Sequence, residues 1–369
     1  MSNLSVDQVD SKTDLSAFEL IKEPHGLIEA ADGWQRLEAF ANSPTQHFIW
    51  SQAAAESFET ADRLQIVLSG SPQNPTAIAP LVKGREDAAR LEMLGLSELT
   101  EPEDFIHAGA DALEDLAQTL AALKMAIMLE RTPADSPLIG AIKEAYRSRG
   151  IVHTAPALGC PYIELDEGWR DPLQKFNAGR RSDFRRASRN AEKFGEVSFE
   201  ICSPAPHEVA PLVEEAFRVE AGSWKGEEGS ALAIDARRGG FYRRYALLAA
   251  QKGILKLCFL RVNGQAIAMQ YAVECHGRFW LLKIGYDDQY SRCSPGNLLM
   301  LHTLGYAAEK GLLSYEFLGT AAPWTQVWTN ALRECVLIRA YPASRSGITT
   351  FAVDASKSAF GKLKRLSSR

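Results

Sequence analysis

The spacing of apolar residues divides the chain into alternating helices and strands. Apolar residues at helical spacing predict helices over 111–124 and 136–150. Short apolar runs bounded by turn residues predict strands over 64–70, 75–84 and 125–131. The first half of the chain is therefore expected to be a mixed α/β unit.

The second half repeats this rhythm and adds a three-stranded antiparallel meander. Helices are predicted over 168–195, 207–224 and 240–253, and strands over 254–262, 265–275 and 278–286. Asn263-Gly264 separates the first two of these strands and is a strong hairpin signal. A helix over 298–311 and strands over 313–320 and 330–341 then finish the sheet. The expected fold class is α/β (α+β), with tandem mixed sheets flanked by helices.

Composition narrows the class of protein without identifying it. The chain has 369 residues, a 46% hydrophobic content and a formal net charge of -5, which suits a globular protein and argues against general nucleic-acid binding. Its six cysteines are scattered, and its N-terminus is polar, with no apolar core of a signal peptide. No run approaches the ~18 apolar residues of a spanning helix. A cytoplasmic protein with no transmembrane segment is expected.

The loop YDDQYSRCSPGNLL, residues 286–299, joins the third meander strand to a helix. Helix N-termini present unpaired backbone amides and a partial positive charge, and glycine allows a ligand to approach closely. The loop thus predicts a phosphate cradle, built from Arg292 and from the amides of Ser294, Gly296, Asn297 and Leu298. The alternative is an ordinary helix start with Ser294 as its N-cap.

The meander, the R-x-x-x-G-x-L loop, the helix and the following strand together resemble the GCN5-related N-acetyltransferase (GNAT) fold. Residues from about 176 to 328 are most similar to the CelD-like branch, which is found with bacterial cellulose and exopolysaccharide genes and is related to the FemABX group. The stretches that carry the likeness include RRSDFRRASRNAEKFG, LRVNGQAIAMQY, the loop itself and YEFLGTAAPWTQVW. The resemblance implies that acetyl-CoA or another acyl-CoA is the co-substrate. Its pyrophosphate would lie on the loop, and its pantetheine along the strand that ends at Ile284 and Tyr286.

This sequence departs from the family pattern at one place. The family commonly has an aromatic-Lys pair after the penultimate strand, whereas Trp324-Thr325 stands here. Many GNAT enzymes also use a tyrosine near this position to protonate the leaving thiolate, and Trp324 has no acidic proton to give. The sequence therefore leaves the general acid open.

Candidate acceptor-binding residues lie in three places. Arg181, Arg185 and Arg189 form one stripe of a predicted helix and suit an anionic or nucleotide-linked acceptor, or else a solvated helix face. Trp224 and Lys225 follow the next helix, where the tryptophan would line the acceptor site or anchor the loop on the core. The resemblance adds Trp324 to the acceptor site.

Acyl transfer needs a base for the acceptor and an acid for the leaving group. Glu316 is the first candidate base, because a carboxylate in the apolar strand LSYEFLG must be either functional or paired with a cation. Asp287 and Asp288 are further candidates, although both also suit a turn. Tyr290 is the nearest candidate acid. The seven histidines show no metal-ligand spacing, so no metal is expected.

These features predict an acyl-CoA-dependent N- or O-acyltransferase with an amine or hydroxyl acceptor, and the resemblance suggests a role in exopolysaccharide or cell-envelope synthesis. The alternatives are transfer of an aminoacyl group from a charged tRNA, as in the FemABX group, and a non-catalytic scaffold within a polysaccharide-synthesis complex. We expect a disordered N-terminus over 1–16, a degenerate GNAT-like half over 17–165, the acyltransferase half over 166–345 and a basic tail over 346–369.

Overall fold

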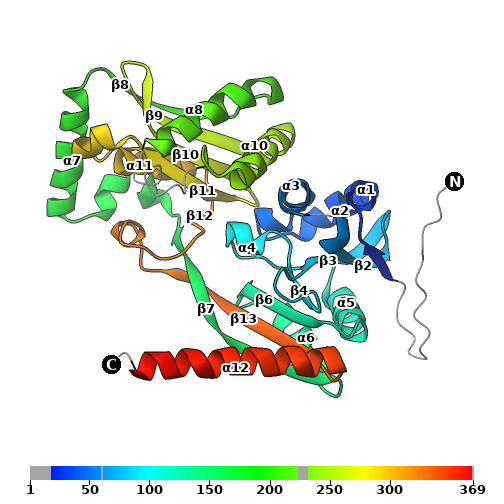
Figure 1. Cartoon of the computed structure of the whole chain (residues 1–369). Coiled ribbons are helices and arrows are strands. Elements are labelled where there is room, and N and C mark those ends of the chain that lie inside the picture. The colour runs from blue at the N-terminus through cyan, green and yellow to red at the C-terminus, as the bar shows by residue number, and fades with distance from the viewer. Residues whose placement is uncertain (1–17, 60, 223–231, 368–369) are drawn as a thin grey trace.

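The computed structural model describes residues 18–59, 61–222 and 232–367, and these form one continuous mixed sheet flanked by helices (Figure 1). The sheet has 13 strands, ordered β1-β2-β3-β4-β6-β13-β7-β12-β11-β10-β9-β8, with β5 paired to β3. The strands are β1 (Phe18–Ile21), β2 (Leu64–Ser71), β3 (Asn74–Lys83), β4 (Arg90–Met93), β5 (Ile106–His107), β6 (Ala126–Pro133), β7 (Gly150–Glu164), β8 (Val197–Cys202), β9 (Leu255–Val262), β10 (Gln265–Cys275), β11 (Arg278–Tyr286), β12 (Ser314–Glu316) and β13 (Leu332–Pro342). The mixed α/β fold class is confirmed.

Helices cover both halves of this sheet. They are α1 (Pro24–Glu29), α2 (Ala31–Leu37), α3 (Phe48–Phe58), α4 (Leu96–Leu99), α5 (Ala110–Ala122), α6 (Leu138–Tyr146), α7 (Ala178–Glu192), α8 (Val209–Ala221), α10 (Ala236–Gln251), α11 (Pro295–Glu309) and α12 (Arg345–Ser367). No helix among the described residues is long and apolar enough to cross a membrane.

Strand β13 lies in the middle of the sheet, between β6 and β7, and does not finish the sheet of the second half. The reason is the length of β7, which spans both halves (Figure 1). Its first part pairs with β13, while Glu164 and Tyr162 near its end pair with β12. The sequence predicted strand β13 but not its position between β6 and β7. Strands that pair although they lie far apart in the chain leave no local pattern in the sequence.

The predicted meander is confirmed as β9-β10-β11. Asn263 and Gly264 have φ values of 49° and 81°, and His276 and Gly277 have 52° and 67°. Positive φ at both central residues is what a two-residue hairpin of this type requires. The two tight turns thereby fix the register that brings the end of β11 to the start of α11.

An aromatic cluster holds the two halves together where α3 packs against α10. The Trp50 ring lies edge-on to Phe241 and Tyr245, with centroid distances of 4.9 and 5.1 Å, and Phe58 stacks on Phe241 at 5.4 Å. The Phe241 and Tyr245 side chains are fully buried. The halves therefore share a core, and a site between them can be rigid.

The basic tail forms the long helix α12, which is anchored on the first half of the sheet (Figure 1). Arg90 Nη2 donates to Asp354 Oδ1 at 2.7 Å, and the Tyr341 hydroxyl donates to the other carboxylate oxygen at 2.7 Å. The predicted disordered N-terminus over 1–16 lies outside the described residues.

Candidate cofactor cavity

A cavity opens where β11 and β12 separate. The two strands pair only from Arg278 with Ser314 to Trp280 with Glu316, and β11 then continues to Tyr286 paired with β10 on its other side but not with β12. The cavity of about 570 Å³ lies between this part of β11, whose edge toward β12 is unpaired, the start of α11 and the segment 317–328. Its volume falls within the range of small-molecule sites, about 300–1,000 Å³.

The wall made by β11 contains a β-bulge. Tyr271 of β10 pairs with Lys283 and Ala272 pairs with Leu281, so Leu282 is the extra residue on β11. Bulges often stand beside active sites, because the unpaired residue redirects the backbone. Leu281 through Tyr286 all line the cavity, including the expected cofactor residues Ile284 and Tyr286.

The start of α11 forms the second wall and has an unusual backbone. A short 3-10 helix over Asp288–Cys293 is followed by Ser294 in the left-handed region, with φ 47° and ψ 54°, and then by α11. Three of the four amides expected to cradle a phosphate donate within the loop itself: the Ser294 N–H to the Ser291 carbonyl at 2.9 Å, and the Asn297 and Leu298 N–H groups to the Ser294 carbonyl at 3.0 and 3.2 Å. The Ser294 side chain does not cap the helix. Ser294 nevertheless holds the N-cap position, and its carbonyl accepts the Leu298 N–H at 3.2 Å, so the ordinary helix start stays open as the alternative for this loop.

The structure brings most of the expected cofactor residues together and leaves two outside. Ser294, Gly296 and Asn297 line the cavity with Ile284 and Tyr286. Leu298 is buried in the core of the second half. Arg292 is exposed and is not among the lining residues, and its carbonyl accepts a hydrogen bond from Asn190 of α7 at 3.3 Å.

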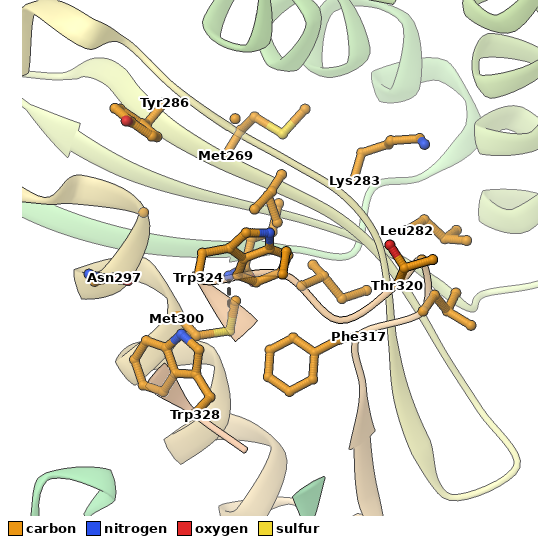
Figure 2. A pocket seen from close by; sticks show the side chains of 18 of the residues that line it. Met269, Leu282, Lys283, Tyr286, Asn297, Met300, Phe317, Thr320, Trp324 and Trp328 are labelled. Atoms are coloured by element: carbon orange, nitrogen blue, oxygen red, sulfur yellow. Dashed lines mark hydrogen bonds between the residues drawn. The ribbon is translucent and has the colours of Figure 1, made fainter. Parts of the chain in front are cut away.

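Aromatic and sulfur-containing side chains gather on one side of the cavity, where Trp324, Trp328, Phe317 and Met300 lie together (Figure 2). The Trp324 ring lies edge-on to Phe317 at 5.8 Å and is 38% exposed. The expected acceptor residue Trp324 is thus part of an apolar wall at the cavity, where it can contact a bound ligand.

Two charged residues that the sequence analysis missed also line the cavity, Glu101 and Lys283. Glu101 is buried, the Gly319 backbone N–H donates to its Oε2 at 2.9 Å, and burial raises the pKa of its carboxyl, although nearby Lys283 opposes this shift. Burial lowers the pKa of the Lys283 ammonium. Lys283 lies at the far end of the cavity from Asn297 (Figure 2). Lys283 could have been found from the sequence, because it is the single lysine in the apolar strand RFWLLKIGY. Glu101 lies in an acidic loop, where nothing in the sequence distinguishes it from an exposed glutamate.

The expected base Glu316 is a buried carboxylate that is ion-paired with the partly exposed Arg333. Arg333 Nη2 donates to Glu316 Oε1 at 3.0 Å, and the Ser314 hydroxyl donates to the same oxygen at 2.6 Å. Glu316 and Arg333 line a second cavity of about 780 Å³ and are not among the residues that line the first. In the structure Glu316 is therefore paired with an arginine, which was the alternative to a catalytic role.

The other expected catalytic residues cap and pack the loop. Asp287 accepts a hydrogen bond from the backbone N–H of Gln289 at 3.0 Å and so starts the 3-10 helix. The Tyr290 ring lies edge-on to Phe194, with centroids 5.1 Å apart. Neither residue is among those that line the cavity, so a catalytic role for them stays a prediction.

The expected acceptor residues on α7 lie beside the loop, because α7 contacts the 3-10 helix. Arg185 and Arg189 are exposed, whereas Arg181 is partly buried and donates to the Phe176 carbonyl at 3.1 Å. A basic surface therefore adjoins the exposed Arg292. Trp224 and Lys225 lie outside the described residues.

Comparison with known proteins agrees with this geometry. Residues 178–326 match the family model described as an acetyltransferase (GNAT) domain. No curated protein matches the chain in sequence.

Three solved structures share the overall fold. The C-terminal domain of a putative lysylphosphatidylglycerol synthetase from Agrobacterium fabrum has a TM-score of 0.53 at 12% identity, over 90% of this chain and 95% of that one. L-PGS from Bacillus licheniformis has a TM-score of 0.54 at 11% identity, over 90% and 96%. FemX has a TM-score of 0.54 at 13% identity, over 87% and 96%. The fold is GNAT-like, and the CelD-like branch stays a resemblance.

Proposed function

We propose that this protein is an acyl-CoA-dependent acyltransferase that transfers an acetyl or longer acyl group to an amine or hydroxyl. The observation that carries the proposal is the cavity between β11 and β12, which Gly296 at the start of α11 lines together with the ionisable residues Glu101 and Lys283. A role in exopolysaccharide or cell-envelope synthesis rests on the sequence resemblance alone.

The pyrophosphate of the acyl-CoA would lie against the start of α11. Ser294 and Gly296 line the cavity there, and a Cβ added to Gly296 would meet only Tyr286 Cδ1 at 3.7 Å, so the backbone is open to a ligand. The exposed Arg292 and the basic face of α7 would provide a positive field beside the phosphates. This assigns Arg292 to attraction of the ligand and not to the wall of the cavity.

The thioester would lie along β11 at the bulge. A pantetheine arm that runs beside Ile284 and Tyr286 extends the sheet where β12 has separated. The backbone around Leu282 is redirected by the bulge and would polarise the thioester carbonyl. The apolar wall of Phe317 and Trp324 would keep water away from this carbon.

Acid–base chemistry would come from the two halves together. Glu101 accepts the proton from the acceptor amine or hydroxyl, whose nitrogen or oxygen attacks the thioester carbon. The bond to that carbon forms, the carbon–sulfur bond breaks, and the CoA thiolate leaves. Lys283 gives the thiolate its proton, because burial lowers the pKa of the ammonium and makes it a better acid. The family's aromatic-Lys position holds Trp324-Thr325 here, and the missing lysine favoured a non-catalytic scaffold. Lys283 places a different lysine at the cavity, which weakens that argument.

Thermal unfolding with millimolar acetyl-CoA, free CoA, longer acyl-CoAs or aminoacyl-tRNA tests the proposal. Binding to the folded state raises the unfolding midpoint by an amount that grows with ligand concentration over its Kd. We expect a rise with acetyl-CoA or a longer acyl-CoA. No rise with any CoA compound would contradict the proposal, and a rise with the aminoacyl-tRNA alone would favour the aminoacyl-transfer alternative.

A further inference from the structure

Three side chains that could bind a metal ion meet at the junction of the two halves, next to Gln46 and Arg278, which line the second cavity. His47 is the residue just before α3, and Cys275 and His276 lie at the end of β10 and in its turn to β11. One potential ligand atom from each residue lies within 4.8 Å of the others. The sequence expectation of no metal rested on local spacing, which cannot reveal a site assembled from segments this far apart in the chain.

The two imidazoles face each other through the nitrogens that would bind a metal. His47 Nε2 and His276 Nε2 are 2.6 Å apart, and the ring planes meet at 69°. Without a metal, one nitrogen must keep a proton that the other accepts. In a tetrahedral zinc site with Zn–N bonds of about 2.0–2.1 Å, the two nitrogens would be about 3.3 Å apart. The two nitrogens would therefore have to separate by roughly 0.7 Å, and ligand atoms that now lie up to 4.8 Å apart would have to approach to about 3.5 Å, the S···N spacing of such a site. His276 is exposed on its two-residue turn and can supply this movement.

The surroundings shift the pKa of each of the three side chains. Burial lowers the pKa of His47 to about 3, with His276 and Lys252 as further causes, and burial also lowers the pKa of His276. Burial raises the pKa of the Cys275 thiol to about 12. A coordinated cation offsets this by deprotonating the thiol directly.

The charged groups around the cluster come in compensated pairs. The Lys252 ammonium is ion-paired with Glu38, whose other carboxylate oxygen accepts the Phe48 backbone N–H at 2.9 Å. On β11, Arg278 Nη1 lies 3.9 Å from Glu316 Oε1. These pairings reduce the repulsion that an incoming cation would meet.

We propose that His47, Cys275 and His276 bind a zinc(II) ion that joins the two halves, with water as the fourth ligand. Two nitrogens and one thiolate form a borderline-soft donor set that suits zinc over magnesium or calcium. Binding releases the thiol proton of Cys275 and moves the shared imidazole proton to the other nitrogen of its ring. The ion would tie the start of α3 to the β10–β11 turn, and so would brace the strand that lines the acyl cavity. The inference does not depend on the proposed acyl transfer.

Zinc affinity of the full-length, tag-free chain under reducing conditions is the test, measured by competition with a chromophoric chelator. The key variant is His276→Asn, because Asn263 occupies the corresponding position of the other two-residue turn with a similar φ. Cys275→Ser removes the thiolate. Matched controls are His25→Gln on α1, whose side chain is exposed, and Cys202→Ser on β8. We expect one zinc ion per wild-type or control chain, and binding weakened by roughly 100-fold in each ligand variant.

Two further readouts separate a site from adventitious binding. Cobalt(II) should give a thiolate-to-metal charge-transfer band in the wild type and in Cys202→Ser but not in Cys275→Ser. Zinc should raise the unfolding midpoint of the wild type more than that of His276→Asn. The proposal is overturned if the wild type binds no zinc at micromolar concentration, if His276→Asn binds zinc as tightly as the wild type, or if the cobalt band survives in Cys275→Ser.

Discussion

The backbone N–H of Gly319 donates a 2.9 Å hydrogen bond to Oε2 of Glu101. Gly319 follows β12 in the second half, whereas Glu101 comes from a loop after α4 in the first half. This bond places a buried carboxylate from the first half at a cavity that the second half mostly builds. The first half thus contributes a residue to the proposed site, although only residues 178–326 match the acetyltransferase domain.

Replacement of Glu101 by glutamine should separate catalysis from binding. The amide oxygen can still accept the Gly319 N–H, but it cannot take a proton from the acceptor. We expect CoA release in the presence of an amine acceptor to slow by roughly 10²–10⁴-fold, with acetyl-CoA affinity nearly unchanged. Glu334→Gln on the exposed face of β13 is the control. Unchanged turnover in Glu101→Gln would remove this residue as the base.

The Glu316–Arg333 pair should behave as a structural unit. Arg333→Met leaves a 3% exposed carboxylate without its closest cation. Because Arg333 itself is 38% exposed, we expect a loss of about 2–3 kcal/mol in the free energy of unfolding, somewhat below the usual cost of breaking a buried pair. The double variant Glu316→Gln/Arg333→Met should recover part of this loss and keep acetyl-CoA binding, as measured by urea unfolding and calorimetry. Loss of turnover alone in Glu316→Gln would instead restore Glu316 as a catalytic candidate.

The aromatic contact between α3 and α10 should be a main source of stability. Phe241 is fully buried against Trp50 and Phe58. Phe241→Ala should lower the free energy of unfolding by about 3–5 kcal/mol, because it opens a cavity in a shared core. Phe40→Ala is the matched control, since Phe40 is 53% exposed. Equal unfolding midpoints for the two variants would contradict a shared core.

Stability should depend on pH through Asp104. Burial raises the pKa of Asp104 to about 7, partly opposed by hydrogen bonds from Ser136 and the Phe105 backbone. Between the ordinary value of 3.8 and about 7, the folded chain holds a proton that the unfolded chain has released. The free energy of unfolding therefore falls as pH rises across this window. Asp104→Asn should lose this fall, whereas the exposed control Asp111→Asn should keep it. Parallel urea midpoints against pH for wild type and Asp104→Asn would refute the assignment.

The sequence was informative where the structure is local. The hairpin at Asn263-Gly264, the meander and the junction of strand, loop and helix at Ser294 all follow from turn chemistry and apolar periodicity over short stretches. The sequence also allowed for a Glu316 that is paired with a cation, because a carboxylate in an apolar strand needs a partner. The structure has this pairing, with Arg333.

Long-range arrangements carried no such signal. The insertion of β13 between β6 and β7, and the approach of Glu101 to the cavity, depend on which distant segments pair. The juxtaposition of His47 with His276 is of the same kind. Local propensity does not encode these choices, which are decided by burial and register across the whole sheet.

Calorimetric titration of acetyl-CoA into Gly296→Trp and Gly240→Trp tests the cofactor site most directly. Gly296 lines the cavity at the start of α11, and Gly240 lies in α10, with nothing within 4 Å of an added Cβ. The account predicts binding to the wild type and to Gly240→Trp, and binding weakened by roughly tenfold or more in Gly296→Trp. Equal affinity in all three proteins, or no binding to the wild type, would contradict the placement of an acyl-CoA in this cavity.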